Sequence, residues 1–140
     1  MQDLHNNVTP KRVLSPVSVA DNTAQVGQII DRAGYDSLEY LIATGSLGDA
    51  GAEFTTLLEH GDQANLSDAA AVPDSMLLGT EALASFIQSD DDKVFKLGYI
   101  GDKRYTRLTI TPTNNATAAL IAAIALLGHP RSAPTVNPPA

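Results

Sequence analysis

The stretch of residues 93–131 constrains the fold more than any other part of the chain, because its apolar residues alternate with polar ones and then end at prolines. It reads KVFKLGYIGDKRYTRLTITPTNNATAALIAAIALLGHPR. Alternation with a period of two is typical of β-strands, and pairs such as Gly-Asp and Asn-Asn are typical of the turns between them. The pattern predicts three consecutive strands, over residues 93–100, 104–111 and 116–127, and then a segment that cannot join a sheet.

The third of these segments is ambiguous between strand and helix. Its alanines favour a helix, whereas Leu120, Ile124 and Leu126 lie at even spacings that suit a strand. Gly128 and Pro130 end the segment promptly, and the elements before it are strands. We therefore favour a central strand and leave the helix open.

The first two thirds of the chain contain shorter segments with the same period. Gly27 interrupts one of them and marks a bulge, which is typical of an edge strand. Residues 60–75 are rich in Asp, Ala, Ser and Gly and predict a long surface loop. Strands are predicted over residues 17–20, 24–30, 37–44, 53–59 and 81–88.

About eight short strands with regularly spaced turns predict an all-β fold, a jelly-roll-like antiparallel β-sandwich. At 140 residues the chain suits one domain. Prolines and a shortage of core-forming residues at both ends predict extended arms, because proline removes a donor from the strand ladder. The expected division is an extended N-terminal arm over residues 1–16, a sandwich over 17–127 and a proline-rich C-terminal arm over 128–140.

Composition restricts the classes of function. The chain has no cysteine, which excludes disulfides, thiolate metal sites and a cysteine nucleophile. Its 16 acidic and 9 Lys or Arg residues leave a net charge of −7, which opposes binding to nucleic acid phosphates. No stretch has the pattern of a signal peptide or the ~20 apolar residues of a membrane span. We expect a soluble, non-secreted protein with neither nucleic acid nor membrane as a partner.

Candidate catalytic and metal-binding groups are few. His5, His60 and His129 have no neighbours at ligand spacing and are expected at the surface. The sequence GSLG at residues 45–48 lacks both the context of a nucleophile elbow and the lysine of a phosphate-binding loop. The acidic run at residues 90–92 lacks the spacing of a calcium loop and predicts a solvated turn. We therefore expect no enzyme activity, no cofactor and no metal.

Basic and aromatic residues supply one candidate binding surface. Lys103, Arg104 and Arg107 are clustered in the sequence beside Tyr99 and Tyr105, and such a face can grip a carbohydrate or a carboxylate-bearing protein surface. Ordinary outward side chains of a strand are the other interpretation. The cluster leaves open an alternative function, a carbohydrate-binding or fibre-associated β-sandwich module. Against it, the aromatic content is 5% with no Trp, and sugar platforms rely on aromatic stacking.

Several stretches resemble small structural proteins encoded beside the major capsid gene of tailed phages and prophages. They are VSVADNTAQVGQIIDRAGYDSLEYLIATGSL, LLGTEALASF and LGYIGDKRYTRLTITPTNNATAALIAAIALLGHPR, and the resemblance extends over nearly the whole chain. The chain looks most like the capsid cement, or decoration, protein of the short-tailed Bordetella phages. This resemblance implies a jelly-roll protein on the outside of an icosahedral head, where such proteins pair across local two-fold axes and clamp neighbouring capsomers.

The resemblance therefore implies a virion protein on the outer capsid surface, made in the host bacterial cytoplasm. Its expected partners are the major capsid protein and a second copy of itself, as a homodimer. Extended arms bury much surface per residue when they become ordered on a partner, and repeated contacts around a closed shell add by multivalency and resist the pressure of the DNA. The expected contact residues are basic: Lys11, Arg12, Arg104, Arg107 and Arg131.

Overall fold

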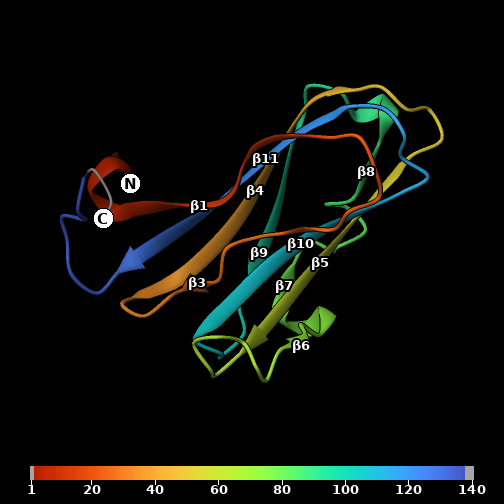
Figure 1. Cartoon of the computed structure of the whole chain (residues 1–140). Helices are drawn as coiled ribbons and strands as arrows, with labels where there is room; N and C mark the ends of the chain where they lie inside the picture. The colour runs from red at the N-terminus through yellow and green to blue at the C-terminus, as the bar shows by residue number, and fades with distance from the viewer. Residues whose placement is uncertain (1, 138–140) are drawn as a thin grey trace.

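The computed structural model describes residues 2–137 and confirms the all-β prediction, because two antiparallel sheets pack there as a sandwich (Figure 1). In order across the sheet, sheet A consists of β1 (Val8–Val19), β11 (Ala119–Pro130), β4 (Tyr35–Leu47), β9 (Val94–Tyr99) and β7 (Leu77–Leu78). Sheet B consists of β2 (Gln25–Val26), β10 (Tyr105–Thr113), β5 (Glu53–Gly61) and β6 (Ala70–Ala71), with β3 (Ile30–Asp31) also paired to β10 and β8 (Phe86–Ile87) to β5. The short 3₁₀ helices are η1 (His5–Asn7), η2 (Asp74–Met76) and η3 (Gln88–Asp90).

Inward-facing side chains of the two sheets form the core. Leu97 of sheet A and Leu58 and Leu108 of sheet B are completely buried. The hydroxyl of Tyr40 crosses between the sheets and lies 2.6 Å from Oγ1 of Thr106. A buried hydroxyl without a partner would cost ~1–3 kcal/mol, so this hydrogen bond is part of what holds the two layers in register.

The ambiguous alanine-rich segment is a strand, as the sequence favoured. It forms β11, which lies between β1 and β4 in sheet A. Ile124, near its middle, is opposite Arg12 on one side and Leu41 on the other. Backbone hydrogen bonding to two neighbours outweighs the helix propensity of alanine, which is a weak preference that tertiary context overrides.

The predicted N-terminal arm is wrong in part, because residues 8–16 belong to β1. The ladder between β1 and β11 begins at the pair Val8 and Gly128. Pro10 and Pro16 are compatible with this strand, because β1 is at the edge of sheet A and the N–H groups on its free side need no partner. Proline thus limited the position of the strand in the sheet and did not exclude it from the sheet.

The C-terminal segment is also more closely attached than the prediction of an arm implies. β11 continues to Pro130, and the chain then turns back towards η1. The amide of Thr135 donates to the Asn6 carbonyl at 3.0 Å, and its hydroxyl donates to the Val8 carbonyl at 2.7 Å. The segments before β1 and after β11 therefore lie side by side at one end of the sandwich (Figure 1). The outermost parts of both predicted arms, residue 1 and residues 138–140, are outside the described residues.

Two further predictions had different outcomes. The strand predicted over residues 81–88 is reduced to β8, because the chain forms a turn just before it, where Glu81 Oε1 accepts a hydrogen bond from the Leu58 amide at 2.7 Å. The edge strand predicted over residues 24–30 is confirmed as two short strands, β2 and β3. Both pair with β10, and the break between them begins at Gly27. Within residues 2–137, no helix is long and apolar enough to cross a membrane.

Candidate functional site: the outer face of sheet A

The outer face of sheet A is built from side chains that the strand register places in rows. Directly opposite residues of antiparallel strands project to the same side of a sheet. One row consists of Arg12, Ile124, Leu41 and Lys96. The next consists of Pro10, Leu126, Glu39, Gly98 and Leu78. We call this surface the apolar face; it also includes Pro16, Leu120, Ala122, Ala43, Gly45 and Val94.

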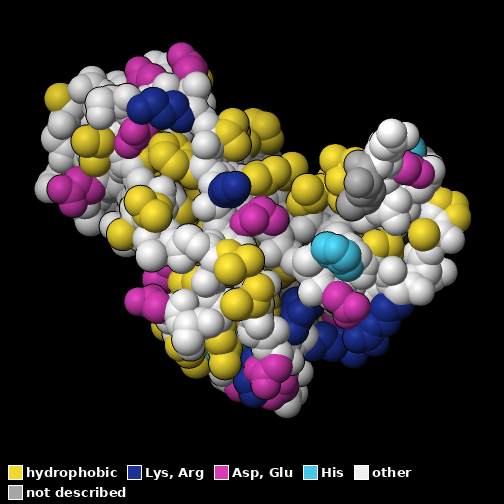
Figure 2. All heavy atoms as spheres, turned by 180° about the vertical axis from the view of Figure 1, so that it is seen from behind, with side chains coloured by type: hydrophobic (Ala, Val, Ile, Leu, Met, Phe, Trp, Pro, Cys, Tyr) yellow, Lys and Arg dark blue, Asp and Glu magenta, His cyan; other side chains and the backbone are white. Residues whose placement is uncertain are grey.

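The large side chains of the apolar face are exposed to solvent. The exposed fraction is 45% for Leu120, 41% for Ile124, 55% for Leu78 and 69% for Val94. Figure 2 shows hydrophobic side chains gathered across the middle of the molecule. Single exposed apolar residues are common on proteins, whereas a group that extends over several strands indicates a contact surface.

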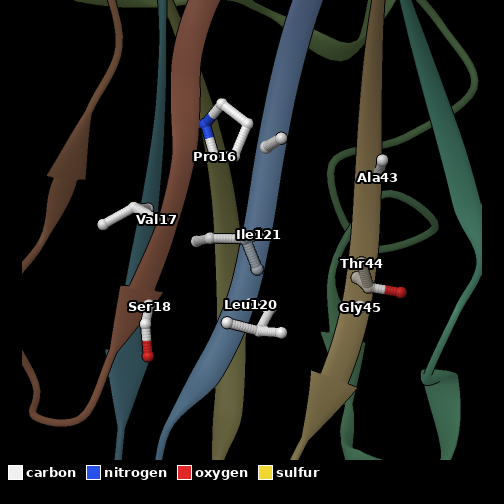
Figure 3. A pocket seen from close by; sticks show the side chains of 9 residues that line it. Pro16, Val17, Ser18, Ala43, Thr44, Gly45, Leu120 and Ile121 are labelled. Carbon is white, nitrogen blue, oxygen red and sulfur yellow. The ribbon is translucent and has the colours of Figure 1, made fainter.

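Shallow clefts indent the apolar face. One, of about 340 Å³, is lined by Pro16 of β1, Leu120 of β11 and Ala43 of β4, so it lies across three adjacent strands (Figure 3). Another, of about 530 Å³, has Leu78 and Val94 in its lining. Apolar hollows of this kind are where the anchoring side chains of a partner dock.

The outer face of sheet B has a different composition. Thr109 and Thr111 of β10 and Thr55 of β5 alternate with buried neighbours and so point outward. Arg107 donates from Nη2 to Glu59 Oε1 at 3.2 Å, between the same two strands. Hydroxyl groups and a self-contained ion pair are what a sheet face turned towards water is expected to carry.

The edges of the two sheets are poor templates for another strand. β1 contains two prolines, and its register with β11 shifts after Arg12 and after Leu14. At the other edges, β2, β3, β6 and β7 have two residues each. Prolines, bulges and short edge strands are the features that prevent pairing between chains. A partner is therefore expected to contact a face of the sandwich.

Two of the predicted basic contact residues are neighbours on β1 but point in opposite directions. Arg12 is exposed, is part of the apolar face, and donates from Nη1 to Ser15 Oγ at 3.2 Å. Lys11 lies opposite the buried Ala125, so its side chain leaves from the other side of the strand. The two cations therefore do not form one patch.

The other three predicted contact residues are ion-paired within the chain. Arg104 donates to both carboxylate oxygens of Asp31, at 2.8 and 2.9 Å, and these hydrogen bonds hold the pKa of Asp31 below its usual value. Arg107 is paired with Glu59, as described above. Arg131 is 3.5 Å from Asp36. A contact role for these residues stays a prediction, and in the free protein their charges are already partly balanced.

The predicted aromatic and basic recognition cluster is not one surface. Tyr99 belongs to sheet A and is 2% exposed, whereas Tyr105 and Arg107 lie on sheet B. The Tyr99 hydroxyl is 2.8 Å from Nδ1 of His60, which is itself buried, so the prediction of a surface histidine is wrong at this position. Burial, and after it the positive charge of Lys103, lowers the pKa of His60.

Reasoning from the sequence did not identify the apolar face, although β11 contained a signal for it. Both alternating sets of this strand are apolar: Ile121 and Ala123 face the core, and Leu120 and Ile124 face outward. A strand that is apolar on both sides is typical of one that is covered on both sides. Within residues 2–137 only the inner side is covered.

Comparison with known proteins supports the fold. The chain is similar to a solved structure described as the PBSX exported protein XepA, with a TM-score of 0.57 and 17% sequence identity. The likeness covers 100% of this chain and 43% of that one, so the chain spans less than half the length of XepA. At this identity the likeness shows a shared fold alone. The fold therefore defines the class of protein as a two-sheet antiparallel β-sandwich.

Two further structures have lower TM-scores. One comes from Bacillus endospore appendages, described as disulfide-linked pili, with a TM-score of 0.42, 11% identity and coverage of 91% of this chain and 96% of that one. The other is the CBM22-1 and GH10 modules of the Clostridium thermocellum xylanase 10B, with a TM-score of 0.42, 8% identity and coverage of 95% and 28%. These values establish no shared fold. No protein-family model and no curated protein matches the sequence.

Proposed function

We propose that this protein is a non-enzymatic structural protein of a phage virion, which binds the outer surface of the icosahedral capsid and cements neighbouring major capsid protein subunits. The observation that supports this role is the apolar face. A broad apolar surface over β1, β11, β4, β9 and β7, indented only by shallow clefts, fits a protein partner better than it fits a small ligand. The resemblance of the sequence to capsid cement proteins supplies the identity of the partner.

The apolar face provides the binding free energy in this proposal. Complete burial of an exposed leucine or isoleucine contributes ~1.5–3 kcal/mol, and the face carries several, among them Leu78, Leu120 and Ile124. The loss of translational and rotational freedom offsets a large part of this in a single contact. Many copies around a closed shell contact subunits that are already linked, so modest individual contacts stabilise the whole shell.

The acidic remainder of the molecule has a separate role in the proposal. The net charge of −7 keeps the free protein soluble despite its exposed apolar face. The terminal segments, joined through Thr135 and Asn6, extend the contact at one end of sheet A. The homodimer across a local two-fold axis, which the resemblance implies, completes the proposed arrangement on the shell.

Co-sedimentation with capsid shells tests this function. Purified protein is mixed with shells of the same phage from which the protein has been stripped, and a glycan array is probed with the same sample. We expect saturable binding to the shells and no glycan signal. Glycan binding without shell binding would establish the carbohydrate-binding alternative in place of the capsid role.

The salt dependence of shell binding separates the apolar face from the basic contact residues. Between 0.1 and 0.5 M salt, ion pairs at the rim weaken by screening, whereas contacts through apolar area persist or strengthen. We expect the affinity to change by less than about threefold over this range. A loss of tenfold or more would assign the binding free energy to ion pairs of residues such as Lys11 and Arg131 and not to the burial of apolar area.

A further inference from the structure

Glu39 is the one acidic residue in the rows of the apolar face. It lies between Leu126 on β11 and Gly98 on β9, in the row that ends at Leu78 on β7. Its Oε2 atom is shielded from solvent and has no hydrogen-bond partner among residues 2–137. A buried carboxylate oxygen without a donor is unusual in a folded protein, because it loses water and gains nothing in exchange.

Gly98 provides the space that the Glu39 carboxylate occupies. A Cβ atom at position 98 would lie 3.0 Å from Glu39 Oε2, 3.4 Å from Oε1 and 2.9 Å from the Cβ of Leu78. Any other residue at this position would displace the carboxylate towards solvent or push Leu78 away. The chain therefore holds the carboxylate in a notch between apolar neighbours.

The chain itself does not neutralise this carboxylate. Burial raises the pKa of Glu39, and the charge of Lys96 on the adjacent strand lowers it only in part. None of the ion pairs within residues 2–137 includes Glu39 or Lys96. The unpaired carboxylate thus destabilises the free protein, and a donor brought by a partner would relieve that cost.

The clefts on the two sides of Glu39 are large enough for a long side chain. One, of about 280 Å³, is lined by Leu38, Leu126 and Ile100, and the other, of about 530 Å³, by Leu83 and Val94; Glu39 lines both. A lysine or arginine packs its aliphatic stem along apolar surface and keeps its charge at the tip. The smaller cleft, whose lining joins aliphatic side chains to the carboxylates of Glu39 and Asp36, matches that shape and that charge, whereas the larger one also has the cation Lys96 in its lining.

We propose that Glu39 determines the specificity of the apolar face by accepting hydrogen bonds from a lysine or arginine side chain of the partner protein. This inference rests on the proposed function, since it names the chemistry that the capsid surface must present. The apolar neighbours provide adhesion without selectivity, whereas a surface without a cation at this point covers the partly buried Glu39 carboxylate and leaves it unpaired. That penalty rejects partners which match the apolar face in shape alone.

The test compares Glu39→Gln with the control Glu53→Gln, which removes a charge from the exposed start of β5. Glu39→Gln keeps the size of the side chain but removes the charge. We expect it to raise the midpoint of thermal unfolding by about 1–4 °C, because a destabilising charge is lost. We expect it to weaken binding to stripped capsid shells by at least about thirtyfold, because the cation of the partner is left unpaired. Glu53→Gln is expected to change neither quantity.

A purely structural role for Glu39 gives a different result. If Lys96 pairs with Glu39 in solution, Glu39→Gln lowers the unfolding midpoint, and the proposal is wrong. Unchanged shell binding by Glu39→Gln also overturns it. Ile124→Asp in the adjacent row separates a failure of the proposed function from a failure of the proposed role of Glu39. If Ile124→Asp binds like the wild type, the proposed function fails; if Ile124→Asp loses binding and Glu39→Gln keeps it, only the role of Glu39 fails.

Discussion

The outer faces of the two sheets differ although both belong to one sandwich. On sheet B, outward positions of β10 and β5 carry threonines and the ion pair of Arg107 with Glu59. On sheet A, outward positions of β11 carry Leu120 and Ile124. Sheet B also has outward apolar side chains, Leu57 on β5 and the exposed Val26 on β2, and both lie opposite Thr109. Folding requires only that inward positions be apolar, so the broader outward apolar surface of sheet A supports the proposed contact with a partner.

Strand β11 shows the same difference within one element. Its inward positions include the small residues Ala119, Ala123 and Ala125, which are completely or almost completely buried. Its outward positions include the larger Leu120 and Ile124. Ile121 and Leu127 also face inward and Ala122 faces outward, so the two sides of β11 are about equally apolar. An outer side as apolar as the inner one is consistent with a second layer that packs on the outside.

The largest expected effect comes from charges placed on the two outer faces. The double variant Leu120→Asp and Ile124→Asp should reduce binding to stripped capsid shells by more than about a hundredfold, because two desolvated charges replace two anchoring side chains. The matched variant Thr109→Asp and Thr111→Asp on sheet B should bind within about twofold of the wild type. Co-sedimentation with the stripped shells measures the affinity of both variants. Equal losses would remove the distinction between the faces.

A smaller effect separates the inner and outer sides of β11. Ile121→Ala should lower the free energy of unfolding by about 2–4 kcal/mol, because Ile121 is 2% exposed and its removal leaves a cavity in the core. Ile124→Ala should cost less than about 1 kcal/mol in the free protein, since much of its side chain is already in water. Urea unfolding of both variants measures the difference. A comparable loss for both would mean that the free protein already covers the apolar face.

The pH dependence of stability should have opposite signs on the two sheets. Burial lowers the pKa of His60, so the unfolded chain binds more protons just below pH 6.5, and stability is lost as the pH falls from about 7 to 5.5. The Tyr99 hydroxyl contacts this histidine, and its pKa is also affected by four charged residues, Lys103, Asp102, Asp62 and Arg32. His60→Gln should flatten this slope in urea unfolding measured across that range. An unchanged slope would show that another group is responsible.

Glu39 provides the opposite slope on sheet A. Its pKa is raised by burial, so the folded protein binds more protons above the usual carboxyl pKa, and its contribution to stability improves as the pH falls towards about 4.5. Asp31 has the opposite pH dependence. Arg104 lowers its pKa, so its contribution to stability is lost as the pH falls into the acid range. The comparison of Glu39→Gln with the wild type between pH 4.5 and 7 isolates the first effect. A difference that does not change with pH would contradict it.

The smallest expected effect concerns the basic residue Arg104. Its bidentate pair with Asp31 is largely exposed and screened by water, so Arg104→Met should lower the free energy of unfolding only slightly. Shell binding should change by less than about twofold, because the pair lies outside the apolar face. A tenfold loss of binding would instead support the basic contact residues predicted from the sequence.

Local alternation in the sequence was enough to predict most of the sandwich. β9 lies within its predicted range, and β10 begins within its own range and continues two residues beyond it to Thr113, because in these segments a period of two is joined to clear turn residues. The same signal failed at residues 81–88, where alternation is present but the Glu81 side chain binds the Leu58 amide and stabilises a turn. At residues 8–16 the prolines obscured a strand, since their cost depends on whether the strand is central or at an edge.

The apolar face could not be predicted from the alternation of apolar and polar residues alone. Alternation shows that β11 has two apolar sides, but it does not show which side meets the core or whether a second layer covers the other. Glu39 lies beside Gly98 because β4 pairs with β9 in this register, although β5 to β8 separate the two strands in the sequence. Composition and periodicity therefore sufficed for the class of fold, because they act through local backbone preference and burial. The candidate binding surface could be recognised only from the packing of distant segments, because exposure is a property of the assembled layers.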